Sequence, residues 1–293
     1  MKICAVILNY RKAKETEACI RSLIGQDIHS VVVVDNSEHE QAAAELEDML
    51  FRLMANEVDF STYVITPPCN LGFSGGVNLA CSSHHVQSSD AVLLINNDAI
   101  ASEGMVSKLA SALSPAWPVA IPIVYTSHQG TQPTFWYQRY FGLMTRGWLP
   151  GAFVFPSGCC LLFRQDFLVD RNLFDEDFFM YGEDVLLGWK LSRKKGVDGP
   201  FLVKDAAVYH IGKERSGDTN LFYEYHTARG HLLLSCKTWH SKLEIPILLL
   251  CKSWSMALRA AHRSFQYKSF IPFFAFFLAW FTLSIRPYGK RQN

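Results

Sequence analysis

The sequence predicts an α/β fold with a mainly parallel central sheet and helices on both of its faces. Three observations lead to this class. In the first half of the chain, short runs of β-branched and apolar residues alternate with longer segments of helix-forming residues. These runs are continuously apolar, as in strands that are buried on both faces of a sheet. The length of 293 residues suits one such core with a small appended element.

The elements are expected in a repeating strand-helix order. The predicted strands of the first half are Ile3–Leu8, Val31–Val34, Tyr63–Ile65, Ala91–Ile95 and Val119–Val124. The predicted helices lie between them, at Lys12–Leu23, His39–Met54, Ser74–His85 and Ser102–Leu113. Because crossover helices join parallel strands, this order supports a parallel sheet.

The second half is less regular. Residues 125–156 mix Gly, Pro and aromatic residues with little periodicity, which predicts a long loop over a site. Strands are expected at Cys160–Phe163 and Ala206–Ile211. Between them, Glu183–Lys195 is expected to form a helix, because it ends in basic residues before a glycine.

The charge is divided unevenly along the chain. Residues 231–293 hold nine Lys and Arg and one acidic residue, a net charge of +8, which leaves residues 1–230 at −7. Nucleic-acid-binding proteins usually spread positive charge over the folded domain, so no nucleic-acid partner is expected. A basic, aromatic-rich tail favours contact with anionic lipid headgroups instead.

From residue 243 onward the tail has the pattern of a helix that lies in a membrane interface. One face would carry Leu250, Trp254, Ala257, Ala261 and Phe265, and another Lys252, Ser255, Arg259, Arg263 and Gln266. The uncharged run from 270 to 285 is shorter than the roughly 20 residues of a span, so an interfacial or re-entrant segment is expected. We therefore expect a globular domain over 1–235 and membrane-associated helices over 236–293.

The eight cysteines include no C-x-x-C pair and no spacing typical of a zinc site. Reduced thiols in a cytosolic compartment are the simplest interpretation. The first ten residues lack the cleavage site of a signal peptide, so they are expected to belong to the fold.

Polar residues follow the predicted strands, where an open α/β sheet binds its ligands. They are Asn9, Asp35 and the trio Asn96-Asn97-Asp98, while the apolar Pro67 follows a further strand. A carboxylate at a strand end can hold a hard divalent cation together with diphosphate oxygens and water. An Asx turn or a helix N-cap at Asp98 is an equally good interpretation of these residues alone.

A glycine-rich turn precedes the third predicted helix, over residues 70–78 (NLGFSGGVN). Glycines let backbone amides approach an anion, and the start of a helix favours negative charge. The glycines at 72, 75 and 76 do not form the G-x-G-x-x-G dinucleotide fingerprint. A plain loop that enters a helix therefore remains an alternative.

Two further features carry titratable groups. Glu183 and Asp184 begin a predicted helix, where the helix dipole favours acids, and either could serve as a general base. His210 ends the last predicted strand, at the same edge of the sheet. A lone histidine is usually structural, but here it could complete a metal site with Asp98.

Seven segments occur in a fixed order: VILNY (6–10), VVVDNS (32–37), NLGFSGGVN (70–78), LLINND (93–98), SGCCLLFR (157–164), LFDEDFFMYGEDVLLGWKLSRKKG (173–196) and VYHIG (208–212). Together they resemble the family 2 glycosyltransferases, and more narrowly the bacterial rhamnosyltransferase-like branch that builds cell-surface polysaccharides. The resemblance covers residues 3–235 and implies a GT-A fold. It also implies an inverting, metal-dependent transfer from a nucleotide-diphosphate-sugar to an acceptor hydroxyl.

The resemblance implies specific roles. Asp184 matches the catalytic base and Glu183 the acid that precedes it. Asp98 and His210 match the ligands of a divalent cation, Mg²⁺ or Mn²⁺, while Asn96 stands where many members have an acid. The residues that match the donor-nucleotide site are Asn9, Asp35, Asn70, Gly72, Asn78, Asn97 and Arg229.

The branch suggests rhamnose as the sugar and a saccharide acceptor, and the basic tail favours a lipid-linked one. With the tail and the reduced cysteines, we expect a peripheral or monotopic protein at the cytoplasmic face of the inner membrane.

Three alternatives remain. A nucleotide-dependent oxidoreductase is disfavoured because no glycine turn follows the first strand. A sugar-nucleotide nucleotidyltransferase is disfavoured because such enzymes usually carry a basic, glycine-rich N-terminal loop, which is missing here. A binding protein that has lost catalysis would be consistent with Asn96.

Overall fold

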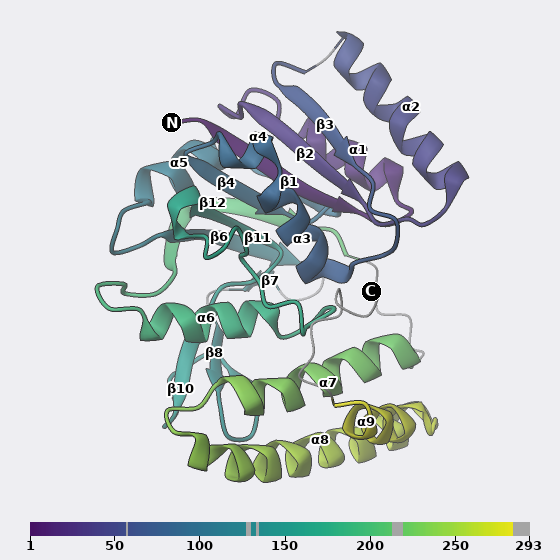
Figure 1. The fold of residues 1–293 in the computed structure, drawn as a ribbon, viewed down its shortest axis with the longest axis vertical. Coiled ribbons are helices and arrows are strands. Elements are labelled where there is room, and N and C mark those ends of the chain that lie inside the picture. Colours follow the sequence, from purple (N-terminus) through teal and green to yellow (C-terminus); the bar gives the residue numbers. More distant parts are fainter. Residues whose placement is uncertain (57, 127–129, 133–134, 213–218, 284–293) are drawn as a thin grey trace.

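The computed structural model describes residues 1–56, 58–126, 130–132, 135–212 and 219–283 (Figure 1). Its central sheet has the order β3-β2-β1-β4-β11-β6-β12-β5, with β7 paired to β6. The strands are β1 (Ile3–Asn9), β2 (Ser30–Asp35), β3 (Ser61–Ile65), β4 (Ala91–Ile95), β5 (Ala99–Ala101), β6 (Val119–Thr126), β7 (Gly130–Gln132), β11 (Cys160–Arg164) and β12 (Phe201–His210).

The sheet is mainly parallel, as predicted. β3, β2, β1 and β4 run parallel, and β6 runs parallel to β12. The exception at the centre is β11, which lies antiparallel between β4 and β6. The predicted strands all form, and most are longer by a few residues than the apolar runs, because polar residues such as Asn9 and Asp35 still pair across the sheet.

Helices cover both faces of the sheet. One face packs against α1 (Ala13–Arg21), α2 (Glu40–Asn56) and α5 (Met105–Ala112). The other packs against α3 (Gly72–Ser82), α4 (His84–Gln87) and α6 (Glu183–Arg193). Alternate residues of β1 enter the two cores, with Ala5 on the first side and Val6 on the second. This double burial explains why the strands are continuously apolar.

Residues 125–156 were expected to form a long loop, and that expectation was wrong. Besides the end of β6 and β7, the segment forms a three-stranded antiparallel sheet of β8 (Phe135–Gln138), β9 (Leu143–Thr145) and β10 (Ala152–Phe155). Tyr137, Phe153 and Phe155 of this sheet pack against α6 and α7 (Leu221–Lys237). These three aromatic residues are the core of the second sheet, while Phe141 and Trp148 of the same segment are exposed.

The C-terminal helices α8 (Ile245–Tyr267) and α9 (Ile271–Phe281) form a layer on α7, at the bottom of Figure 1. Each begins with a proline in its first turn, where the missing N–H has no helical partner to lose. Ala228 and Leu232 of α7 pack against Ala279 of α9. The predicted boundary between residues 235 and 236 lies inside α7.

The orientation of α8 is the reverse of what a lipid-bound basic face requires. Arg259 and Arg263 of its polar face turn inward to the carboxylate of Glu224 on α7, whose side chain is 1% exposed. Lys252 is fully buried, with its ammonium 5.4 Å from the centre of the Tyr137 ring. The apolar residues Trp254 and Phe265 are 64% and 87% exposed. No helix among the described residues is long and apolar enough to cross a membrane.

Candidate active site

A cleft of about 780 Å³ opens where the ends of β1, β4 and β12 meet the start of α6. Nine of the residues singled out from the sequence line it, namely Asn9, Asn70, Gly72, Asn96, Asn97, Asp98, Glu183, Asp184 and His210. Its wall also includes residues that sequence reasoning missed, among them Tyr10, Lys12, Asn36, Tyr181 and Phe222. The fold thus gathers strand ends and the starts of α3, α6 and α7 from distant parts of the chain into one space.

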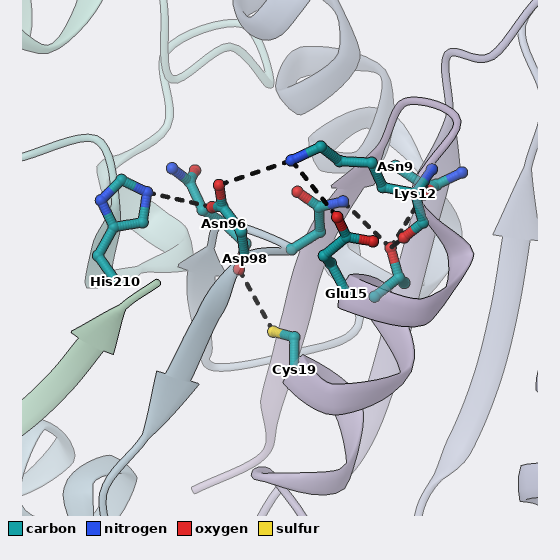
Figure 2. Close-up of polar contacts among 9 residues, drawn as sticks. Asn9, Lys12, Glu15, Cys19, Asn96, Asp98 and His210 are labelled. Carbon is teal, nitrogen blue, oxygen red and sulfur yellow. Dashed lines mark hydrogen bonds and ion pairs between the residues drawn. The ribbon is translucent and has the colours of Figure 1, made fainter. Parts of the chain in front are cut away.

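Asp98 and His210 are in direct contact. Asp98 lies in the turn between β4 and β5, and His210 ends β12, which pairs with β5. His210 Nε2 lies 3.1 Å from Asp98 Oδ1, and Lys12 Nζ lies 3.9 Å from Asp98 Oδ2. Figure 2 shows the two groups approaching the carboxylate from opposite sides. Burial opposes ionisation of Asp98, but His210 and Lys12 outweigh it and lower the pKa of the carboxyl.

Glu183 and Asp184 open the first turn of α6, after Gly182 at a φ of 108°. Asp184 Oδ2 accepts the N–H of Gly158 at 3.3 Å, and Oδ1 accepts the N–H of Val185 at 2.7 Å. Burial raises the pKa of Asp184 to about 6. Burial, with the charge of Asp184 next to it, raises the pKa of Glu183 to about 8. Burial therefore favours the neutral form of both carboxyl groups, and the neighbouring charge adds to this effect at Glu183.

A family model described as glycosyl transferase family 2 matches residues 4–171 of this chain. The chain belongs to this family. It is therefore a glycosyltransferase that transfers a sugar from a nucleotide-sugar. No curated protein matches the sequence.

Solved structures of glycosyltransferases share the fold. Residues 1–349 of TarS from S. aureus are 16% identical, with a TM-score of 0.53 over 90% of this chain and 74% of that one. The mannosyltransferase PcManGT from Pyrobaculum calidifontis, in complex with GDP-Man and Mn²⁺, is 12% identical, with a TM-score of 0.57 over 97% and 76% of the two chains.

Glucosyl-3-phosphoglycerate synthase from Mycobacterium tuberculosis, in complex with Mn²⁺, UDP and glucosyl-3-phosphoglycerate, is 15% identical. Its TM-score is 0.51 over 82% of this chain and 81% of that one. At these identities the likeness concerns the fold, which is the GT-A type expected from the family 2 motifs.

Asp98 and His210 suit a divalent cation that takes most of its ligands from the bound substrate and water. Among the described residues, no group of three or more His, Cys, Asp or Glu side chains could hold a metal ion. The two side chains converge on one point of the cleft wall and would supply one oxygen and one nitrogen. The other positions would fall to diphosphate oxygens and water, as is usual for Mg²⁺. Asn96 lines the same wall, so its amide stands where an acid would add charge.

Asn9 and Asp35 join two strand ends of this family 2 fold. Asn9 Nδ2 donates to Asp35 Oδ1 at 2.9 Å, and Asn9 Oδ1 accepts the Thr16 hydroxyl at 2.9 Å. Asp35 is 2% exposed and also accepts the hydroxyl of Ser37. The structure thus places Asp35 behind the cleft wall. The next residue, Asn36, lines the cleft, and its Oδ1 is buried with no hydrogen-bond partner in the described structure.

Asn78 and Arg229 also lie outside the cleft wall and hold the chain that forms it. Asn78 Oδ1 accepts the N–H groups of Leu173 and Phe174 at 3.0 and 3.1 Å, and its Nδ2 donates to Phe174 O at 2.9 Å. Arg229 is buried and donates to Asp177 O at 2.6 Å. Both side chains fasten the segment that leads to Glu183 and Asp184. Their polar groups therefore support the site from behind.

Asn70 and Gly72 lie on the cleft wall and shape the turn into α3. Asn70 Oδ1 accepts the N–H of Gly72 at 2.8 Å. Gly72 has a φ of +70°, and a Cβ there would lie 2.3 Å from the carbonyl oxygen of Phe179. Only glycine allows this approach. On the opposite wall, Asn97 Nδ2 donates to the Thr16 hydroxyl at 3.2 Å.

Proposed function

We propose that this enzyme transfers the sugar with inversion at the anomeric carbon, in one displacement. The observation that carries the proposal is the cleft itself, because Asp184 and the Asp98–His210 pair line the same space. The first is suited to an acceptor hydroxyl, and the second to the diphosphate of a donor. A base and a leaving-group site in one cleft are what direct displacement requires.

In this mechanism Asp184 accepts the proton of the acceptor hydroxyl. The acceptor oxygen then bonds to the anomeric carbon while the bond from that carbon to the diphosphate breaks on the opposite face. The N–H groups of Gly158 and Val185 hold both oxygens of Asp184 in place. The pKa of Glu183 is raised further than that of Asp184, which favours Asp184 as the base. Lys12, beside Asp98, adds positive charge on the donor side.

We propose that Asp98 and His210 hold a divalent cation, which when bound supplies positive charge to the departing diphosphate. The partly exposed carboxylate and imidazole, 3.1 Å apart on the cleft wall, support this assignment. So do the Mn²⁺ ions of the mannosyltransferase and synthase structures. The donor sugar is proposed to be rhamnose, from the branch that the motifs resemble. The neighbours bind GDP-Man and UDP, so these nucleotides belong in any donor panel.

The test is release of nucleotide from GDP-, UDP- and dTDP-sugars by the full-length protein, with and without Mg²⁺ or Mn²⁺. We expect one donor to be used, only with metal. Asp184→Asn should lose transfer by roughly 10²–10⁴-fold while it still binds that donor. Full transfer by this variant would refute the base assignment. A protein that binds a donor but never releases its nucleotide would favour the second candidate, a binding protein, which the neutral Asn96 suggests.

We further propose that the enzyme lies on the cytoplasmic face of the inner membrane through the exposed apolar face of α8 and α9. This face includes Leu250, Trp254, Leu258, Phe265, Phe274, Phe277 and Phe281. An apolar patch of this kind on the surface of a globular protein usually marks an interaction site. Because the arginines of α8 are held by Glu224, the apolar residues would make the main contact. All eight cysteines are free, which is consistent with a reducing compartment.

Vesicle sedimentation tests this location. Trp254→Ser, Leu258→Ser and Phe274→Ser change exposed side chains, so the fold should persist while binding to vesicles falls. Phe51→Ser and Met54→Ser on α2 change equally exposed apolar residues at the opposite end of the molecule and serve as the control (Figure 1). Equal binding of both sets would refute the assignment of this face.

A lipid-linked saccharide is the acceptor that we propose. α7 joins the cleft to the apolar layer, because Phe222 in its first turn lines the cleft and Tyr225 contacts the end of α9. The Tyr225 hydroxyl lies 2.8 Å from Thr282 Oγ1. A saccharide on a lipid could therefore reach Asp184 past Phe222 while its lipid stays beside α9. Faster transfer to a lipid-linked acceptor than to the same saccharide without lipid would support this proposal.

A further inference from the structure

A second cavity lies away from the catalytic cleft, between the C-terminal ends of α6 and α7. These helix ends are on the left of Figure 1. It has a volume of about 550 Å³ and shares no lining residue with the cleft. Its walls are Asp175, Leu186, Trp189, Lys190, Arg193, Lys194, Cys236, Lys237 and Trp239. Four cationic side chains and two indole rings thus surround one open space, and neither group has a part in the proposed transfer.

The positive charge of this cavity is only partly compensated. Lys237 Nζ lies 2.8 Å from Asp175 Oδ2 and 2.5 Å from Asp177 Oδ2, so both acids are already engaged. Within the described part of the chain, Lys190, Arg193 and Lys194 form no ion pair with a carboxylate. Basic residues in the last turn of a helix are favoured by its dipole, so their presence alone does not define a site. Their convergence with Lys237 on one cavity leaves a net positive concavity, which attracts an anion.

The two tryptophans give the cavity fixed walls. The Trp189 ring packs against Phe153 and His240, with centroids 5.3 and 5.0 Å apart, and Arg193 lies 5.7 Å from its centre. Trp239 donates its indole N–H to Cys236 O at 2.9 Å. Indole rings with a polar end are favoured at the boundary between lipid and water. A phosphate with an apolar or ring-bearing substituent matches both kinds of wall.

The location of the cavity identifies the source of that phosphate. Its wall at Cys236, Lys237 and Trp239 leads directly into a short turn at Lys242–Glu244 and then into α8. Leu243 is highly exposed there, at the edge of the apolar face proposed to meet the membrane. We propose that this cavity binds a phosphate group, and that the phosphate belongs to the headgroup of an anionic phospholipid. This proposal rests on the proposed membrane location.

Vesicle binding by the full-length protein is the test. Lys190→Gln, Arg193→Gln and Lys194→Gln are combined, and a control with equal loss of charge combines Lys14→Gln, Arg52→Gln and Lys204→Gln. Wild-type protein should bind phosphatidylcholine vesicles more tightly when they contain phosphatidylglycerol. The cavity variant should lose this gain, on the order of 10- to 100-fold, while the control keeps it. Trp239→Leu leaves the charge unchanged and should lose part of the gain in binding that phosphatidylglycerol gives. The same loss in the control and the cavity variant would overturn the site.

A second arm uses inorganic phosphate and identifies the source. If phosphate protects wild-type protein against thermal unfolding but not the cavity variant, while both bind the two vesicle types equally, the cavity takes a soluble phosphate compound and the lipid assignment is overturned. If the variant and the control respond equally to phosphate and to vesicles, no site exists. If wild-type protein binds no vesicles, the membrane location fails, and the phosphate arm still decides the cavity. Donor hydrolysis, unchanged in all variants, reports that each is folded.

Discussion

His210 Nε2 lies 3.1 Å from Asp98 Oδ1, although 112 residues separate them in the chain. The contact depends on β5, the three-residue strand that directly follows Asp98. β5 pairs antiparallel with the end of β12, with Ala99 opposite His210. The backbone adds a second link, because the N–H of Ile211 donates to Asp98 O at 2.9 Å. Strand pairing at the sheet edge therefore positions the Asp98–His210 pair on the cleft wall.

The charge of Asp98 should set the demand for metal. Asp98→Asn keeps the shape of the side chain and removes its charge, so the Mn²⁺ concentration for half-maximal activity should rise on the order of 100-fold. Asn96→Asp adds a carboxylate on the same wall and should lower that concentration. The measurement is a metal titration of donor hydrolysis. Three identical titration curves would show that neither residue holds the ion.

Activity should rise with pH as Asp184 ionises. A base must be in its carboxylate form, and burial raises the pKa of Asp184 to about 6. The pH profile of kcat/KM should therefore fall below a pH of about 6. In Asp184→Glu, which keeps a base but moves it, the acid limb should persist at lower activity, whereas Asp184→Asn should lose it. An acid limb in the residual activity of Asp184→Asn would assign the titration to another group.

Glu224 should hold α8 on the protein. Its carboxylate accepts hydrogen bonds from Arg259 and Arg263, both at 2.7 Å. Glu224→Gln leaves two partly buried guanidinium groups without a counter-charge and should cost roughly 3 kcal/mol in the free energy of unfolding. Glu17→Gln, which removes a surface ion pair of 2.8 Å with Arg21, should cost less than about 1 kcal/mol. Denaturant unfolding of both variants measures the difference. Equal losses of stability would show that Glu224 does not hold α8 on the protein.

Gly72 and Gly25 have the same backbone conformation, so comparing their alanine variants separates backbone strain from steric contact. Gly72 and Gly25 have φ values of +70° and +73°, but only a Cβ at Gly72 meets another atom, the carbonyl oxygen of Phe179. Gly25→Ala should cost about 1 kcal/mol through its backbone alone. Gly72→Ala must also displace Phe179, which lines the cleft, so it should lose more stability and weaken donor binding. Equal stability and equal donor affinity of the two variants, measured by unfolding and by donor titration, would refute the close approach at Gly72.

The sequence predicts the sheet well because burial on both faces leaves a direct trace in it. The strand expected at Ala91–Ile95 forms with those bounds, and Asp98 follows it into the cleft. The small second sheet left no such trace. Its strands are three or four residues long, and aromatic side chains such as Tyr137 and Phe153 replace regular alternation. Runs this short are hard to tell from loops by periodicity.

Polarity at a strand end does not reveal which way a side chain points. Asp35 and Asn36 are adjacent in the chain, yet Asp35 bonds to Asn9 behind the wall and Asn36 lines the cleft. Periodicity has the same limit in α8, where it groups Lys252 with Arg259 but does not say which face meets the protein. The partner that decides this, Glu224, lies on another helix. Long-range pairing determines both outcomes, and a single sequence does not display it.

The position of α7 has a practical consequence for anyone who produces this protein. A gene shortened after α7 would encode a chain whose Ala228 and Leu232 lose their cover from α9. The face of α7 that packs against α8 and α9 would then be exposed to water. We expect such a fragment to accumulate as insoluble aggregates. Solubility is better sought by changing the outer side chains of α8 and α9 than by removing the helices.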